Sequence, residues 1–101
     1  IKYNNVSQFG LLGLCKSEEE YISNLEKLYN LLEKGGILLG ANWCFSESYS
    51  RKMGFNNNYL SEKIIQNFEK KRNCKILTVK KVPIYNDTNY DSVLIYAIKY
   101  E

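Results

Sequence analysis

The feature that most constrains this chain is an amphipathic stretch placed between two apolar runs. The runs Val6 to Leu14 and Ile37 to Trp43 are almost continuously apolar, as is typical of strands that are covered on both faces of a parallel sheet. Between them, apolar residues recur at the three- and four-residue spacing of one helix face, namely Tyr21, Leu25, Leu28 and Leu32. The pattern therefore predicts a strand, a helix and a second strand that pairs in parallel with the first.

Local signals set the ends of the expected helix. Ser17 is a favourable N-cap residue, and Glu20 three positions later completes a capping box. Gly35-Gly36 is expected to stop the helix after Lys34, because a glycine readily takes the left-handed conformation that closes a helix.

The second half of the chain predicts one more helix and two more strands. Residues 44–60 have no clean periodicity and are rich in Ser, Asn and Tyr, and a loop this long inside a compact domain is usually functional. We expect Ser61 to cap a helix that runs to about Arg72, followed by strands at 75–82 and 92–100. The expected order is β-α-β-α-β-β, which belongs to the α/β class.

Composition narrows the possible functions. The chain has 101 residues, which fit one domain, and a net charge of +3, which is too mild for a nucleic-acid-binding protein. It has no histidine and no metal-ligand spacing, and it lacks the run of about 18 apolar residues that a membrane span needs. Its three cysteines are far apart, at Cys15, Cys44 and Cys74. We therefore expect a cytoplasmic protein with reduced thiols and no metal, nucleic-acid or membrane partner.

The expected sheet is incomplete by itself. The first strand is predicted to be apolar on both faces, yet only two helices are available to cover the sheet. An open hydrophobic edge strand invites aggregation. We therefore expect the natural protein to be longer, with an upstream segment that pairs with this strand.

Four segments carry a resemblance to known enzymes: LLGLCKSEEEY at 11–21, LLEKGGIL at 31–38, the loop with Ser46 and Tyr49 that continues into FNNNYL at 55–60, and SVLIYAIKY at 92–100. Together they resemble the second half of the nicotinamide, phenylethanolamine and indolethylamine N-methyltransferase family, a group of class I S-adenosylmethionine-dependent methyltransferases. The Gly-Gly element alone is common to many class I methyltransferases, whereas its combination with the Ser/Tyr loop is more specific.

The resemblance implies a fold and an activity. The family has a Rossmann-like sheet of seven strands whose last strand is antiparallel. Residues 1–101 would be the C-terminal portion of that single domain, and the N-terminal half that binds most of the cofactor, S-adenosyl-L-methionine, would be absent, since no G-x-G-x-G occurs here. The full-length enzyme would be a monomer that methylates the amine or pyridine nitrogen of a small molecule, and this portion alone would be inactive.

The resemblance also implies site residues. Gln8 lies where the family contacts the cofactor, and Asn42 lies where it has a substrate-binding Asp, so a charge is lost there. Ser46 and Tyr49 match the substrate loop, and Asn57 falls where a Ser bonds the acceptor. No catalytic acid, base or metal ligand is expected, because methyl transfer from a sulfonium depends mainly on alignment. Each of these residues also has a plain structural interpretation, such as a strand polar group or an interfacial tyrosine.

Two other functions stay open. A non-catalytic methyltransferase-like binding or assembly domain is favoured slightly by the departures from the family at Asn42 and Leu12, where the family is acidic. A nucleic-acid-binding module would use Lys and Arg with interleaved Tyr. A G-x-G-x-G loop encoded upstream would favour the enzyme.

Overall fold

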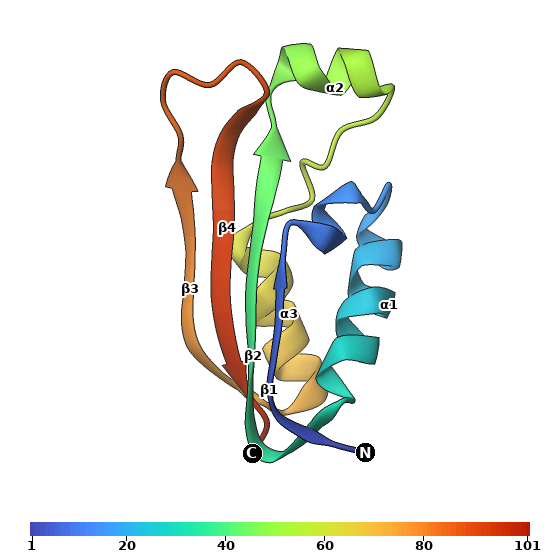
Figure 1. Cartoon of the computed structure of the whole chain (residues 1–101), viewed down its shortest axis with the longest axis vertical. Coiled ribbons are helices and arrows are strands. Elements are labelled where there is room, and N and C mark those ends of the chain that lie inside the picture. The colour runs from blue at the N-terminus through green and yellow to red at the C-terminus, as the bar shows by residue number, and fades with distance from the viewer.

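A computed structural model describes all 101 residues and has an α/β fold (Figure 1). The elements are β1 (Tyr3–Phe9), the 3-10 helix η1 (Leu11–Leu14), α1 (Glu18–Tyr29), β2 (Leu32–Phe45), α2 (Glu47–Met53), α3 (Glu62–Arg72), β3 (Lys75–Pro83) and β4 (Tyr90–Lys99). The four strands form one mixed sheet in the order β1-β2-β4-β3. No helix is both long enough and apolar enough to cross a membrane.

The strand directions agree with the sequence prediction. β1 pairs with β2 in parallel, as the strand-helix-strand pattern requires. β4 is antiparallel to both of its neighbours, β2 and β3, so the last strand in the chain is the one that runs against the others. The helices α1 and α3 lie against one face of the sheet, and α2 lies beyond the carboxyl end of β2 (Figure 1).

The first strand differs from its prediction. β1 ends at Phe9, and the rest of the predicted strand forms η1. The strand ends at Gly10, whose φ of 86° is in the left-handed region that favours glycine. The N–H of Gly10 still donates to the carbonyl of Ala41 at 2.7 Å. β1 is also not buried on both faces, since Gln8 is its one buried residue. The apolar run at 6–14 therefore comes from two short elements and not from one covered strand.

The end of the first helix was also predicted wrongly. α1 begins as expected, with the Ser17 hydroxyl accepting a bond from the Glu20 N–H at 3.1 Å, but it ends at Tyr29. Gly35 and Gly36 lie inside β2. A Cβ on Gly36 would lie 3.1 Å from the carbonyl oxygen of Tyr3, so the glycine allows β1 and β2 to approach there and does not cap a helix.

The second half follows the predicted order with one addition. Residues 44–60 contain a helix, α2, which was not predicted because the segment is rich in Ser, Asn and Tyr and has no apolar periodicity. α3 and the last two strands lie within two residues of their predicted ends. Ser61 is the N-cap residue of α3, as predicted, but its side chain makes no capping hydrogen bond.

The core lies between the sheet and the helices α1 and α3. Sixteen buried residues form one cluster, which includes Tyr21 and Leu25 of α1 and Phe68 of α3. The even-numbered residues of β2 and β4 face this cluster, for example Leu38, which pairs with Ile98.

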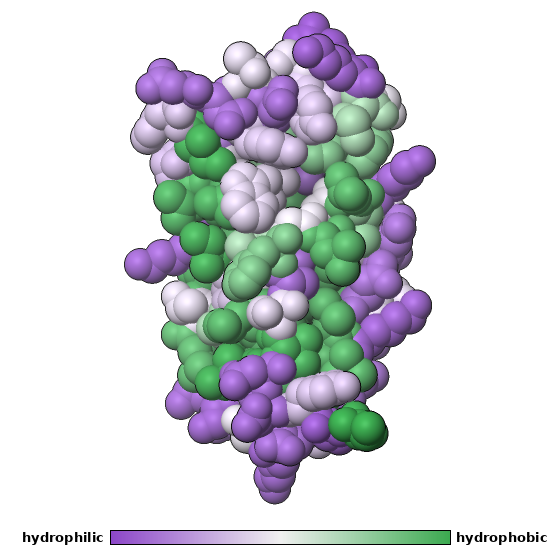
Figure 2. All heavy atoms as spheres, viewed as in Figure 1, coloured by the Kyte–Doolittle hydropathy of each residue, from purple (hydrophilic) through white to green (hydrophobic).

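The opposite face of the sheet carries large apolar side chains that no element covers. It is formed by the odd-numbered residues of β2 and β4, as in the pairs Ala41–Ile95 and Trp43–Val93. Phe9 is 65% exposed and Ile95 is 41% exposed. Figure 2 shows this face, with apolar residues over the strands and hydrophilic residues gathered at both ends. We refer to it as the open sheet face.

The two edges of the sheet differ in character. β3 carries three lysines and ends at Pro83, and both residue types are common devices against unwanted pairing at an edge. β1, with the sequence YNNVSQF, has no charged residue and no proline. The β1 edge therefore lacks the protection that the β3 edge has.

Candidate functional site

Two hollows lie near the carboxyl ends of β1 and β2, where ligands bind in open α/β sheets. The smaller, which we call the strand-end hollow, has a volume of about 130 Å³ and is lined by Gly10, Gly13, Leu14, Trp43, Phe45 and Tyr90. The larger, which we call the α2 hollow, has a volume of about 720 Å³ and lies beside α2 and the loop that follows it. Phe45 is the one residue that lines both hollows.

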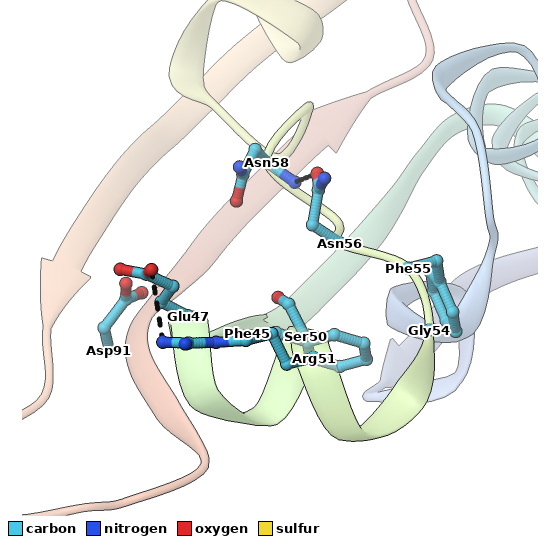
Figure 3. A pocket seen from close by; sticks show the side chains of 9 residues that line it. All are labelled: Phe45, Glu47, Ser50, Arg51, Gly54, Phe55, Asn56, Asn58 and Asp91. Atoms are coloured by element: carbon cyan, nitrogen blue, oxygen red, sulfur yellow. Dashed lines mark hydrogen bonds and ion pairs between the residues drawn. The ribbon is translucent and has the colours of Figure 1, made fainter.

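The α2 hollow is polar and open to solvent. Its lining residues are labelled in Figure 3: Phe45, Glu47, Ser50, Arg51, Gly54, Phe55, Asn56, Asn58 and Asp91. The Glu47 and Arg51 side chains form an ion pair at 3.2 Å, and both are largely exposed, so the pair contributes little to stability.

Gln8 and Asn42 meet in the core, on the helix side of the sheet. The Gln8 amide donates to the side-chain oxygen of Asn42 at 2.8 Å, and the Asn42 amide donates back to Gln8 at 3.0 Å. The hydroxyl of Tyr21 donates to Asn42 at 2.7 Å, and the hydroxyl of Tyr96 accepts from Gln8 at 2.8 Å. This buried network (Gln8, Tyr21, Asn42 and Tyr96) is closed, because its members satisfy one another.

The network is joined to the strand-end hollow through the backbone. The Gln8 side-chain oxygen also accepts from the N–H of Leu12, which fixes η1 behind the end of β1. Asn42 precedes Trp43, whose side chain lines the hollow. The two predicted residues thus hold the walls of the hollow, while their own side chains lie beneath it.

Burial keeps the phenols of this network neutral. It raises the pKa of Tyr21 far above its usual value, and the neighbouring Tyr96 raises that pKa further. Burial also raises the pKa of Tyr96, to about 12, although its hydrogen bonds with Tyr21 and Gln8 oppose the shift. Both groups are therefore protonated near neutral pH and act as hydrogen-bonding groups, not as bases.

Asn57 clamps three segments together. It is fully buried, and its amide donates to the carbonyl of Gly13 at 3.0 Å and to that of Trp43 at 2.9 Å. Its side-chain oxygen accepts from the N–H of Phe45 at 2.8 Å. All three partners belong to residues that line the strand-end hollow, so Asn57 sets the position of its walls.

Ser46 and Tyr49 lie together at the start of α2. The Ser46 hydroxyl accepts from the Tyr49 N–H at 3.2 Å, as an N-cap, and donates to the carbonyl of Thr88 at 2.7 Å. The Tyr49 ring packs edge-on against Phe45, with ring centroids 5.0 Å apart, and lies 5.5 Å from the ring of Tyr90. Tyr49 therefore supports two aromatic walls of the hollow from behind.

The sequence did not identify Trp43 and Leu14 as site residues. Trp43 is 36% exposed, and Leu14 is 59% exposed. Strand alternation could have found Trp43, because a residue next to a buried one on a strand points to the opposite face. Leu14 carried no such signal, since its place depends on η1, which replaced the end of the predicted strand.

The cysteines are not part of either hollow. All three are free and buried. Burial raises the pKa of the Cys15 thiol, which disfavours the reactive thiolate. The side chains also contain no group of three or more His, Cys, Asp or Glu that could hold a metal ion.

Comparison with known proteins assigns no family to this chain. No family model matches it, and no curated protein matches it. A functional conclusion therefore depends on the residues, the sequence resemblance and the geometry of the hollows.

Proposed function

We propose that this chain is the acceptor-binding half of a class I S-adenosylmethionine-dependent methyltransferase that methylates the nitrogen of a small amine or pyridine. In this proposal the sheet belongs to a Rossmann-like domain, and a further segment of polypeptide supplies its other strands and most of the cofactor site. The strand-end hollow is the part of the acceptor site that this half provides.

The observation that carries the proposal is the asymmetry of the sheet. The β1 edge is unprotected, whereas the β3 edge carries lysines and a proline. The open sheet face exposes large apolar side chains next to the β1 edge, including Phe9. A surface of this kind is costly to leave in water, and contiguous apolar patches usually mark contact surfaces. Both features fit a sheet that continues beyond β1 and is covered on its open face.

The chemistry of methyl transfer suits the residues at the hollow. When bound, S-adenosyl-L-methionine supplies a methyl group on a sulfonium, so the acceptor nitrogen forms its new bond to carbon as the carbon–sulfur bond breaks and sulfur keeps that electron pair. The protein mainly has to align the reacting atoms and exclude water. Aromatic walls such as Trp43 and Tyr90 can do both, and no basic residue is required.

The hollow can hold only part of the two reactants. Ligand sites usually have volumes of about 300–1,000 Å³, and the strand-end hollow has about 130 Å³. A cofactor as large as S-adenosyl-L-methionine does not fit inside it, which is consistent with a site divided between two segments. A direct contact of Gln8 with the cofactor, or of Asn42 with the substrate, stays a prediction. For such a contact to form, the ligand would have to replace one of the hydrogen bonds between these two side chains.

A non-catalytic binding or assembly domain of methyltransferase type is the second candidate. The observation that favours it is the closed network, in which Gln8 and Asn42 satisfy each other in the core. In that case the unprotected edge would serve assembly alone, and the longer protein would not bind S-adenosyl-L-methionine.

The test uses the polypeptide extended by the residues encoded upstream of Ile1. We expect it to transfer a labelled methyl group from S-adenosyl-L-methionine to the amine or pyridine nitrogen of a small aromatic molecule. The 101-residue chain alone should give no binding heat with the cofactor. Micromolar binding by this chain alone, or an extended polypeptide that folds but binds no cofactor, would refute the proposal.

A further inference from the structure

We infer that a hollow at the base of the molecule binds the phosphate group of a phosphomonoester, and that Lys2 and Arg72 hold this group. The inference goes beyond the proposed function and does not depend on it. The hollow, which we call the basal hollow, has a volume of about 250 Å³ and is lined by Lys2, Tyr29, Asn30, Leu32, Arg72 and Tyr100. It lies where α1 and α3 end, at the end of the molecule that carries both termini in Figure 1.

The basal hollow has an excess of positive charge. Two of its lining residues are cations, and none is acidic. The nearby Glu26 carboxylate lies 3.7 Å from Arg72 and 3.8 Å from Lys71, while Lys2 forms no ion pair. Three cations therefore share one carboxylate, which leaves two positive charges unpaired.

Asn30 brings the two lining cations together. Its carbonyl accepts a hydrogen bond from the Lys2 ammonium, and its side-chain oxygen accepts one from the Arg72 guanidinium at 2.7 Å. Two like charges held at one residue repel each other, and an anion bound by both would relieve that repulsion.

The Arg72 guanidinium is fixed before any ligand binds. It lies over the ring of Tyr29, with its Cζ 5.1 Å from the ring centroid. Its bond to Asn30 is its one hydrogen bond within the chain, so most of its five N–H groups are free to donate. A planar guanidinium can donate to two phosphate oxygens at once, and a side chain that is already ordered loses little entropy on binding.

A simpler role for these cations is to complement the ends of the two helices. A helix C-terminus carries about half a negative charge, and α1 and α3 both end beside the hollow. The two helix ends together offset about one of the two unpaired charges, so the hollow stays positive. A phosphomonoester carries a charge of about −1.5 to −2 at neutral pH, and this favours it over a singly charged carboxylate.

A titration with glycerol 3-phosphate, followed in ¹H–¹⁵N spectra at constant low ionic strength, tests the site. We expect saturable shifts of the Arg72 Nε–H and of the backbone amides of Asn30 and Tyr100. The chain has no histidine, so between about pH 7.5 and pH 5 the main group that titrates is the phosphate, whose second pKa is about 6. Affinity should therefore fall about threefold or more at the lower pH. Shifts that do not saturate, or equal affinities at the two pH values, would overturn the inference.

Two variants and a control test the lining. Arg72→Gln should weaken binding about tenfold, because charge-assisted hydrogen bonds are lost. Lys2→Gln should weaken it about threefold or more, and because Lys2 is exposed at the edge of the fold, this variant tests the site even if Arg72→Gln is unstable. Lys70→Gln is the control, since it removes the same charge from the last turn of α3 at an exposed residue that does not line the hollow. Equal weakening by Lys70→Gln and Lys2→Gln would show that net charge alone matters and would overturn the site.

The phosphomonoester can belong to a soluble molecule or to a lipid headgroup, and vesicles distinguish the two. Binding of glycerol 3-phosphate without sedimentation on phosphatidylcholine vesicles that contain phosphatidic acid would assign a soluble ligand. Sedimentation that is lost in Lys2→Gln, together with binding of glycerol 3-phosphate, would assign the headgroup. Sedimentation without saturable binding of glycerol 3-phosphate would overturn the basal hollow as the site.

Discussion

Gly40→Ala is expected to be among the most destabilising single-methyl additions in this chain. The Cβ of an alanine at position 40 would lie 2.2 Å from the Cζ of Tyr96 and 2.5 Å from its hydroxyl. The Tyr96 ring is fully buried and would have to move, so its hydroxyl would lose its bonds to Gln8 and Tyr21. Overpacking costs about 1–3 kcal/mol, and unpaired buried polar groups cost about 1–3 kcal/mol more. We therefore expect a loss of about 2–6 kcal/mol in the free energy of unfolding.

Urea denaturation followed by Trp43 fluorescence measures this loss. A domain of this kind has a total stability of about 5–15 kcal/mol, so the variant should lose a large part of it. Gly54→Ala is the control, because nothing lies within 4 Å of its added Cβ, although its φ of 81° is left-handed. It should cost about 1–2 kcal/mol because of that left-handed φ. A Gly40→Ala variant no less stable than Gly54→Ala would refute the packing of Tyr96 across β2.

Three further predictions follow from the same contacts. Because burial raises the pKa of Tyr21 and Tyr96, the latter to about 12, the contribution of these two phenols to the unfolding free energy should be constant below pH 10, their ordinary pKa, and should fall as pH rises from 10 through 12. A urea midpoint that stays flat from pH 10 to 12 would contradict their burial. Asn57→Ala should lower the free energy of unfolding by about 2–4 kcal/mol, because three hydrogen bonds are lost. The control is Asn58→Ala at an exposed position, which should change it by no more than about 0.5 kcal/mol. Equal urea midpoints for the two variants would refute the clamp. Under the proposed function, Tyr49→Ala in the extended polypeptide should lower turnover of an aromatic acceptor about tenfold with cofactor affinity retained. Equal loss of both would make Tyr49 purely structural.

The sequence predicted the strand directions better than the element ends. Capping chemistry identified the start of α1 at Ser17, because that signal is local. The end of α1 was missed, because Gly35-Gly36 resembles a helix stop, while in the structure Gly36 serves the close approach of β1 to β2. That approach is a tertiary contact, which a local pattern cannot reveal.

The residues named from the sequence lie close to the strand-end hollow, but none of them lines it. Gln8 was expected to contact the cofactor and Asn42 the substrate, and in the structure their side chains bond each other in the core. A side chain of a strand residue can face either side of the sheet, and the choice depends on which side the helices cover. The resemblance indicated position 42 but not which face of the sheet its side chain occupies. Trp43, which points to the opposite face, was therefore overlooked.

The most direct measurement of the central claim is amide hydrogen exchange in β1, in this chain and in the polypeptide extended upstream of Ile1. Alternate amides of β1 face away from β2, and no strand pairs with that edge here. The account predicts fast exchange of these amides in the 101-residue chain and strong protection in the extended polypeptide, together with burial of Phe9. Equal exchange in the two forms would contradict the proposal that the sheet continues beyond β1.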